Sequence, residues 1–293
     1  MSAEKPVRKP DWLKIRMPGG RTYGEVKRTL RGLGLHTVCQ EAACPNLGEC
    51  WGEGTATFMI LGDACTRGCR FCAVTRNAAP SHTADNEPER VASAARDMKL
   101  KHAVVTSVTR DDLPDGGAGI FAETVRALRR VEPNPPTVEL LIPDYTGDAL
   151  RTVLEASPDV CAHNLETVER LTPVLRHPRF SFAHSLECLR EIKEYRKDIL
   201  TKSSLMLGLN ETEDEILSAM EALRTVNTDI LVLGQYLRPA RANIEVSTYL
   251  DESYFTYLAE KGRAMGFGYV AAHPLARTSH RAREALLAVK SAP

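Results

Sequence analysis

The sequence predicts an α/β fold, a partial barrel of six parallel strands, and three observations support this prediction. From residue 57 onward, short apolar runs rich in β-branched residues alternate with longer amphipathic stretches, as expected of repeated βα units. The apolar runs are nearly continuous, which is typical of parallel strands whose sheet is covered by helices. Six such units are fewer than the eight of a complete barrel, so we expect an open one.

The individual elements follow from these patterns in chain order. Strands are predicted at 57–61, 103–108, 137–142, 159–163, 203–209 and 229–233. Helices are predicted at 87–99, 119–131, 147–156, 182–197, 212–226 and 251–265. Glu, Asp or Thr stands near several of these helix starts, where capping residues are expected. The predicted organisation is an N-terminal extension at 1–54, a partial TIM-type (βα)6 barrel at 55–271 and a short C-terminal extension at 272–293.

Composition and charge narrow the possible functions. The 293 residues are 43% hydrophobic and 26% charged, which is ordinary for a folded globular protein and excludes a disordered or collagen-like chain. Lys and Arg total 38 and so do Asp and Glu, so overall charge predicts no attraction to nucleic acid or to a membrane surface. No run approaches 18 apolar residues, and the N-terminus has no apolar stretch of a secretory signal. We therefore expect a cytoplasmic protein.

Residues 1–31 form a basic lead-in with nine Lys or Arg against three acidic residues. A solvated arm is one interpretation of such a run. A docking surface for an acidic partner, using residues such as Lys5, Arg8 and Lys9, is the other.

Six of the eight cysteines lie between residues 39 and 72. In a reducing compartment clustered cysteines are expected to be metal ligands or catalytic thiols rather than disulfides. The six form two triplets. The remaining two, Cys161 in an apolar strand pattern and Cys188 in an amphipathic helix pattern, are expected to be buried core residues.

The triplet Cys65, Cys69 and Cys72 follows directly after the first predicted strand, at the edge where barrels place their working residues. Three thiolates on one short loop can bind three irons of a 4Fe-4S cluster. The fourth iron then stays open to a substrate, as a catalytic metal requires. A structural zinc knuckle around Cys69-Arg-Phe-Cys72 is the alternative, which the third cysteine and the strand context disfavour.

The segment Cys65-Thr-Arg-Gly-Cys69-Arg-Phe-Cys72 resembles the signature of radical S-adenosylmethionine enzymes, including the aromatic Phe71. The resemblance implies that the amine and carboxylate of S-adenosylmethionine bind the open iron. It also implies that an electron from the reduced cluster cleaves this cofactor to a radical. In such enzymes the cofactor supplies the chemistry and the protein positions it.

The upstream triplet, Cys39, Cys44 and Cys50, again supplies three thiols. Nearby Pro45, Gly48 and Gly52 predict a tight irregular loop that could wrap a second cluster. Three buried structural cysteines are the alternative.

Two cysteine triplets in this order, followed by a barrel, resemble the lipoyl synthase family. That family inserts sulfur at C6 and C8 of an octanoyl group carried on a lysine of a lipoyl carrier protein, using two S-adenosylmethionine molecules. The resemblance implies that the upstream triplet holds an auxiliary 4Fe-4S cluster that is consumed as the sulfur donor. The similar segments span nearly the whole chain: CPNLGECWGEGTATFMILGDACTRGCRFCAV, KHAVVTSVTRDDLPDGG, HNLETVERLT, TKSSLMLGLNETEDE and DILVLGQYLRPA.

The family's auxiliary cluster takes its fourth ligand from a serine in a C-terminal Arg-Ser-Ser-Tyr motif. The corresponding residues here are Arg277-Thr278-Ser279-His280, so the resemblance implies Ser279 as the ligand. Thr278 and His280 depart from the pattern, and the packing that Tyr would provide is therefore in doubt. A hydroxyl is a harder and more labile iron ligand than a thiolate, which would suit a cluster that is dismantled. Without the resemblance, Ser279 would be an ordinary surface serine.

Further residues could hold S-adenosylmethionine. Thr106, Ser107, Asn164 and Glu166 lie at the carboxyl ends of predicted strands and could bind its amine or ribose hydroxyls. Helix caps or turn contacts are the alternative for each. Gly208 and Glu211 resemble a strand-end motif that lines the adenine in related enzymes, although Glu211 could equally cap the next helix. Residues that could border an acyl channel are Lys202, Gln235, Tyr236 and Arg238.

The resemblance also implies partners. They are an octanoylated carrier domain (a 2-oxoacid dehydrogenase E2 subunit or a glycine cleavage H protein), a reducing electron donor and an iron-sulfur carrier that rebuilds the auxiliary cluster. Two other functions stay open at this point. One is an electron carrier with two fully cysteine-ligated clusters, since eight cysteines divide into two sets of four. The other is a different radical S-adenosylmethionine enzyme that inserts sulfur.

Overall fold

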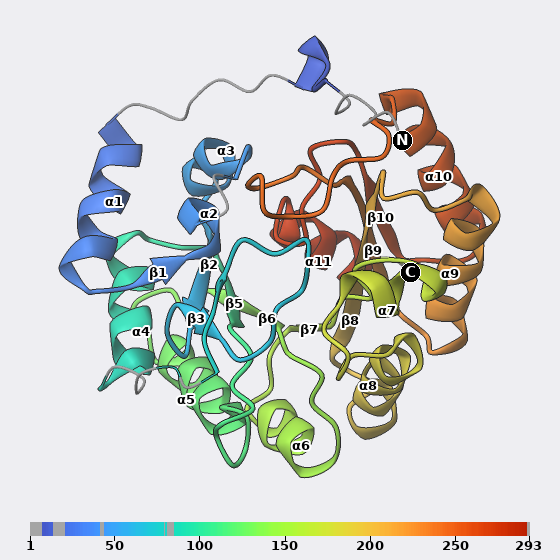
Figure 1. Cartoon of the computed structure of the whole chain (residues 1–293). Helices are drawn as coiled ribbons and strands as arrows, with labels where there is room; N and C mark the ends of the chain where they lie inside the picture. Colours follow the sequence, from blue (N-terminus) through green and yellow to red (C-terminus); the bar gives the residue numbers. More distant parts are fainter. Residues whose placement is uncertain (1–7, 14–20, 42–43, 79, 81–84, 292–293) are drawn as a thin grey trace.

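The computed structural model describes residues 8–13, 21–41, 44–78, 80 and 85–291, and its central feature is one large, mostly parallel sheet (Figure 1). The strand order is β1-β2-β5-β6-β7-β8-β9-β10. Neighbouring strands run parallel except β1 and β2, which are antiparallel. Within the described residues no pairing joins β1 to β10. The sheet is therefore an open partial barrel, which confirms the predicted fold class.

All six predicted strands and all six predicted helices are present, with ends shifted by three residues at most. The strands are β2 (Thr55–Ile60), β5 (His102–Ser107), β6 (Thr137–Leu141), β7 (Val160–Ala162), β8 (Leu200–Leu207) and β9 (Ile230–Gln235). The helices are α4 (Glu87–Asp97), α5 (Ala118–Arg129), α6 (Gly147–Glu155), α8 (Phe182–Tyr195), α9 (Glu213–Thr225) and α10 (Glu252–Ala264).

These helices run around the outside of the sheet (Figure 1). Each presents an apolar face inward, as in α5, where Phe121, Val125 and Leu128 are buried at helical spacing. Thr212 begins α9 with a reciprocal capping box to Glu215, as expected for a threonine at a helix start. Among the part of the chain that the structure describes, no helix is long and apolar enough to cross a membrane.

Several elements were not predicted. They include β1 (His36–Thr37), β10 (Tyr269–Ala272), α1 (Arg21–Gly32), α2 (Val38–Glu41), α3 (Leu47–Gly52), α7 (Thr172–Leu175) and α11 (Ala282–Lys290). The short strands β3 (Ala64–Cys65) and β4 (Thr75–Arg76) and the 3-10 helices η1 (Asp11–Leu13) and η2 (Glu169–Leu171) were not predicted either. The solvated-arm interpretation is wrong for α1, because Val26 and Leu30 are buried in the core. The predicted irregular loop around the upstream triplet is also wrong, because α2 and α3 carry Cys39 and Cys50. Lys5 lies outside the described residues.

The chain after β10 turns back over the carboxyl end of β9. The backbone N–H of Gln235 donates to the carbonyl of Pro274 (3.2 Å), and that of His273 donates to the carbonyl of Leu233 (3.1 Å). A Cβ atom at Gly234 would lie 2.3 Å from the carbonyl oxygen of Ala276, so this close approach requires glycine. The C-terminal segment is thereby held at the same edge of the sheet as the ends of the other strands.

A buried ion pair lies inside the barrel. Lys202 on β8 donates to Glu139 on β6 (2.8 Å), and because β7 separates these strands in the sheet, the two side chains meet across its concave face. Burial alone would raise the pKa of Glu139, but Lys202 and His102 hold that pKa below its ordinary value. Lys202 is thus buried in the core. It does not border the acyl channel, contrary to the expectation from the sequence.

We predict that Lys202→Met lowers the free energy of unfolding by about 3–5 kcal/mol, because the Glu139 charge would be left buried without a partner. The double variant Glu139→Gln/Lys202→Met should recover most of this loss. Anaerobic calorimetry of the three proteins tests the prediction. Equal transition temperatures for wild type and Lys202→Met would contradict it.

Candidate active site

A loop after β2 carries the triplet Cys65, Cys69 and Cys72. A short parallel ladder, β3 (Ala64–Cys65) with β4 (Thr75–Arg76), closes its base. The backbone N–H of Thr66 donates to the carbonyl of Thr109 (3.0 Å), and that of Arg70 donates to the carbonyl of Leu175 (2.8 Å). These bonds fasten the loop to the segments that follow β5 and β7, so the thiols lie over the carboxyl ends of the strands.

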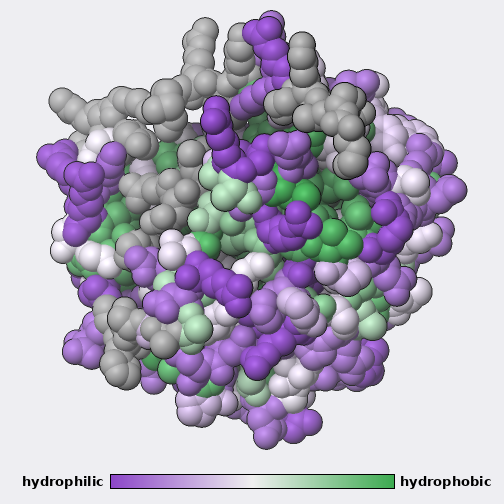
Figure 2. Space-filling view, viewed as in Figure 1, coloured by the Kyte–Doolittle hydropathy of each residue, from purple (hydrophilic) through white to green (hydrophobic). Residues whose placement is uncertain are grey.

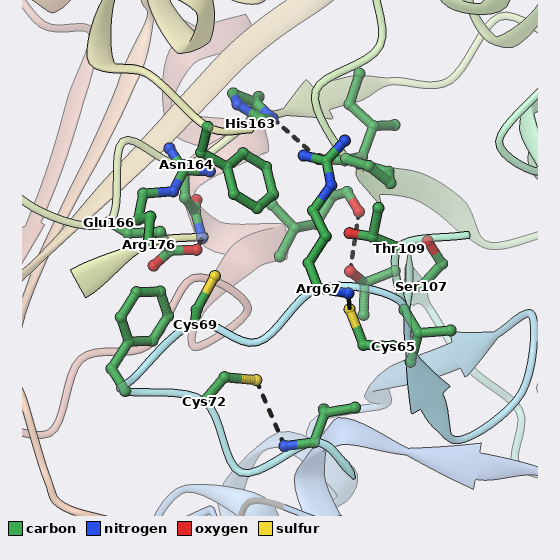
Figure 3. Close-up of a pocket in the computed structure, with 18 residues that line it drawn as sticks. Cys65, Arg67, Cys69, Cys72, Ser107, Thr109, His163, Asn164, Glu166 and Arg176 are labelled. Atoms are coloured by element: carbon green, nitrogen blue, oxygen red, sulfur yellow. Dashed lines mark hydrogen bonds between the residues drawn. The ribbon is translucent and has the colours of Figure 1, made fainter. Parts of the chain in front are cut away.

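The three sulfur atoms are turned toward one shared space (Figure 3). Backbone N–H groups of Arg67 and Val74 donate to the sulfurs of Cys65 (3.4 Å) and Cys72 (3.5 Å), and that of His177 donates to Cys69. Burial raises the pKa of Cys69 and raises the pKa of Cys72 to about 11. Thiols bind iron as thiolates, so a bound metal would stabilise the charge that burial opposes.

The donor set fits a cluster better than zinc. Among the described residues, no three His, Cys, Asp or Glu side chains converge where a single metal ion could be held. A structural zinc site needs such convergence. A 4Fe-4S cluster does not, because each thiolate binds a different iron.

The triplet forms one wall of a cavity at the mouth of the barrel. Phe71, Thr106, Ser107, Asn164 and Glu166 all line this cavity, so the structure brings these predicted residues together. Ten lining residues were not predicted, and four of them carry a charged, titratable or aromatic side chain: Arg67, His163, Arg176 and Phe180. His163 directly follows β7 and could have been found by the same strand-end rule that gave Asn164. Arg176 and Phe180 lie on an irregular loop, where no periodic pattern marks them.

Three polar atoms of the cavity have no hydrogen-bond partner among the described residues. They are Ser107 Oγ, Asn164 Oδ1 and Arg176 Nε, and all are buried. A buried polar atom without a partner is costly unless a ligand satisfies it. A guanidinium suits a carboxylate, while an amide oxygen and a hydroxyl suit amine and hydroxyl donors. The cavity therefore fits S-adenosylmethionine. The Thr106 hydroxyl, by contrast, donates to the carbonyl of Leu141 (2.9 Å) within the sheet.

Glu166 is half-buried at the cavity and has a left-handed backbone (φ 67°). Burial raises the pKa of Glu166, while nearby Arg176 and the amide of Asn164, which donates to Glu166 Oε1 (3.1 Å), oppose the rise. Arg176 itself donates to Ser185 (2.8 Å) and stacks on the ring of Phe180 (4.0 Å). This network fixes the side chains on one side of the cavity (Figure 3).

Two charged or titratable groups at the cavity have structural partners. Arg67 forms ion pairs with Asp111 (2.7 Å) and Asp144 (2.8 Å) and stacks on Phe180 (4.3 Å). Burial, aided by Arg176, lowers the pKa of His163 to about 4, so its ring is neutral at pH 7. The two residues hold the loops that surround the cavity in place.

Gly208 and Glu211 do not line this cavity. The Glu211 carboxylate accepts the backbone N–H groups of Gly208 and Leu209, which shapes the turn after β8. A Cβ atom at Gly208 (φ +95°) would lie 2.2 Å from Nε2 of Gln235. Gly208 and Glu211 therefore make a turn contact after β8.

The upstream triplet forms a second group of thiols. Cys39 and Cys50 are buried, and Cys44 is half-buried. Burial raises the pKa of all three, and that of Cys50 rises to about 12 because Cys44 and Cys39 also lie close enough to oppose its ionisation. As at the first triplet, metal binding would stabilise the thiolates.

The C-terminal segment (residues 275–281) lies against this upstream triplet. Asn46 donates to the carbonyl of Leu275 (2.7 Å), and the backbone N–H of Arg281 donates to the Cys50 sulfur. His280 Nε2 lies 3.3 Å from a carboxylate oxygen of Glu49, a contact made at the position where the family motif has Tyr. Half-buried Ser279 stands between these anchored residues, as a fourth ligand would have to.

The two remaining cysteines take no part in either group. Cys161 on β7 and Cys188 on α8 are both fully buried in the hydrophobic core. They are core residues as predicted, and neither completes a four-cysteine set.

Comparison with known proteins identifies the family. The model of the radical SAM superfamily matches residues 59–223, and that of the N-terminal domain of lipoyl synthase matches residues 2–44. A lipoyl synthase of Anaeromyxobacter sp. (strain Fw109-5) is 51% identical over 283 residues, which is 96% of each chain. That of Thermus thermophilus is 52% identical over 281 residues, 95% of this chain and 87% of its own. The chain belongs to the lipoyl synthase family.

Solved structures agree on the fold. HydG from Carboxydothermus hydrogenoformans superposes with a TM-score of 0.62 at 13% identity, covering 92% of this chain and 68% of that one. Methylornithine synthase PylB gives 0.56 at 12% identity, covering 84% and 81%. As a lipoyl synthase family member, the chain is a sulfur-inserting radical SAM enzyme whose cofactors are S-adenosylmethionine and two 4Fe-4S clusters. This membership sets aside the electron carrier and the other sulfur inserters.

Proposed function

We propose that the chain converts an octanoyl group on a carrier-domain lysine to a lipoyl group, by inserting sulfur at C6 and C8. A second cavity carries this proposal. It shares Phe71 and Glu166 with the first cavity and is bounded on its other side by Ala276, Arg277 and Thr278, next to Ser279. An acyl chain in this second cavity would lie between the two cysteine triplets.

The lining of the second cavity suits an acyl chain. Leu205, Met206, Val232 and Leu237 supply apolar surface, and Gln235 and Tyr236 line it as expected from the sequence. Hydrophobic surface is visible near the mouth of the barrel, surrounded by hydrophilic residues (Figure 2). Burying the methylenes of an octanoyl chain there would contribute about 0.8 kcal/mol each and would exclude water.

We assign the cluster ligands residue by residue. Cys65, Cys69 and Cys72 hold the cluster that binds S-adenosylmethionine, and Arg176, Ser107 and Asn164 bind polar groups of that cofactor. Cys39, Cys44, Cys50 and Ser279 hold the auxiliary cluster. When bound, these cofactors supply hydrogen-atom abstraction and sulfur.

The role of the chain itself is positioning. The loop bonds of Thr66 and Arg70 and the contacts of segment 275–281 hold both ligand groups on either side of the acyl cavity. Each substrate carbon must meet first the abstracting group and then the sulfur, and fixed placement makes both encounters effectively intramolecular. We divide the chain accordingly at residues 54/55 and 271/272. The N-terminal extension then carries the upstream triplet, the barrel carries the triplet Cys65, Cys69 and Cys72, and the C-terminal extension carries Ser279.

The proposed substrate is an octanoylated E2 subunit of a 2-oxoacid dehydrogenase or an octanoylated glycine cleavage H protein. A reducing electron donor and an iron-sulfur carrier complete the cycle, in the cytoplasm. Exposed Arg8 and Lys9 belong to the basic lead-in, which we propose helps to dock an acidic carrier.

Mass spectrometry tests the proposed function. Anaerobically prepared enzyme is incubated with S-adenosylmethionine, dithionite and either an octanoylated H protein or an octanoylated E2 lipoyl domain. We expect the octanoyl group on each carrier lysine to gain two sulfur atoms, with two S-adenosylmethionine molecules cleaved. Dethiobiotin serves as the control substrate. Cofactor cleavage with an unchanged octanoyl group, or sulfur insertion into dethiobiotin, would contradict the proposal.

A further inference from the structure

Thr278 connects the C-terminal segment to the cofactor cavity. Its Oγ1 atom lies 3.2 Å from Nδ2 of Asn164 and 3.1 Å from Oγ of Ser204 on β8. The other polar contacts given above for segment 275–281 reach Asn46, Glu49 and Cys50. The Thr278 hydroxyl therefore connects the segment that carries Ser279 directly to Asn164, whose side chain lines the S-adenosylmethionine cavity.

The hydrogen bonds of Asn164 show what this link does. Both hydrogens of its amide are used within the protein, one toward Glu166 Oε1 (3.1 Å) and one toward Thr278. The carboxylate and the hydroxyl together favour the orientation in which Nδ2 faces them. Asn164 Oδ1 is then left buried at the cavity, with no partner among the described residues. Such an atom needs a donor from a ligand.

We propose that Thr278 is a positioning residue that holds the Asn164 amide with its oxygen toward a donor of S-adenosylmethionine. It thereby couples binding of that cofactor to the seating of the segment that carries Ser279. This inference rests on the proposed function for the identity of the ligand and for the role of Ser279. The coupling is reciprocal by thermodynamic necessity, so bound cofactor also favours the seated segment.

The side chain of Thr278 offers a sharp set of variants. Thr278→Val keeps the branched shape and removes the hydroxyl, whereas Thr278→Ser keeps the hydroxyl and removes a methyl group. Thr152→Val on α6 is a matched control, because its hydroxyl donates to the Asp148 carbonyl within an outer helix (2.9 Å), away from the cavity.

Equilibrium binding of S-adenosylhomocysteine to anaerobically reconstituted holoenzyme tests the proposal without turnover. We expect Thr278→Val to raise the Kd about tenfold, the effect of losing one oriented hydrogen bond. Thr278→Ser and Thr152→Val should stay within about twofold of wild type. Adding Thr278→Val to Asn164→Ala should weaken binding no further, because Thr278 acts through Asn164. An unchanged Kd for Thr278→Val, or additive effects in the double variant, would overturn the proposal.

Iron chelation tests the other direction of the coupling. S-adenosylhomocysteine should slow the loss of auxiliary iron to a chelator in wild type and in Thr278→Ser, and should not do so in Thr278→Val. Equal protection in all three proteins would overturn the coupling. The Ser279→Ala variant separates this test from the proposed function: an unchanged electron paramagnetic resonance signal of the auxiliary cluster in Ser279→Ala would reject Ser279 as a ligand, while the binding data still decide the role of Thr278.

Discussion

Replacing Cys65, Cys69 and Cys72 together with alanine is expected to lower the iron content from about eight to about four atoms per chain. Cleavage of S-adenosylmethionine, and with it sulfur insertion, should be abolished. The physical reason is that all three thiols face one space and accept backbone hydrogen bonds there, so the variant loses the three cysteine ligands of one cluster together. Iron and sulfide analysis with electron paramagnetic resonance, on anaerobically prepared protein, measures both effects.

The matched control for this variant is Cys161→Ala/Cys188→Ala. Both residues are buried core thiols, so the iron content and the cleavage of S-adenosylmethionine should match those of wild type. Zinc in place of iron in the wild-type protein would contradict the assignment. So would cofactor cleavage that survives removal of the triplet.

The second large effect concerns the upstream triplet. Cys39→Ala/Cys44→Ala/Cys50→Ala should also retain about four irons, but it should still cleave S-adenosylmethionine while leaving the octanoyl group without sulfur. The two activities separate because the two thiol groups lie on different elements, one on the loop after β2 and the other on and between α2 and α3. Single-turnover assays that follow 5′-deoxyadenosine and the carrier product together measure this separation.

Single substitutions of Ser279 test the fourth ligand of the same cluster. Ser279→Ala should lower sulfur insertion by more than the roughly 10- to 100-fold typical of residues that only support a metal ligand. Ser279→Cys should keep the iron but slow its release, because a thiolate binds iron more tightly than a hydroxyl. Exposed Ser291 at the end of α11 supplies the control variant Ser291→Ala. Wild-type sulfur insertion by Ser279→Ala would reject the ligand assignment.

Sequence patterns predicted the repeated part of the fold well and its ends poorly. In the βα units the period of the apolar residues reports directly on burial, which is why β5 and α5 were found within two residues of their ends. The two-residue strand β1 and the half-buried strand β10 have too short or too weak a pattern. Helix α3 has only six residues, which is less than two full turns of periodicity.

The residues of the candidate site likewise fall into those that a local sequence pattern predicted and those that it did not. Short-spaced cysteines predict a metal site because the spacing itself places their thiols on one loop. Arg176 and Phe180 were missed because their roles depend on contacts with distant Glu166 and Arg67, which no local pattern encodes. Lys202 was expected to border the acyl channel although no spacing pattern supported that placement, and the fold pairs it with Glu139 in the core.

The sequence by itself determined the chemistry and the architecture: two thiol triplets, a strand-to-loop position for one of them, and βα repeats too few to close a barrel. The tertiary structure alone decided which residues face each other. It brought segment 275–281 to the upstream triplet, joined the two cavities at Phe71 and Glu166, and linked Thr278 to Asn164 across 114 positions of chain. Local patterns report burial and turn preference along the chain, but contacts between distant segments depend on the packing of the complete sheet.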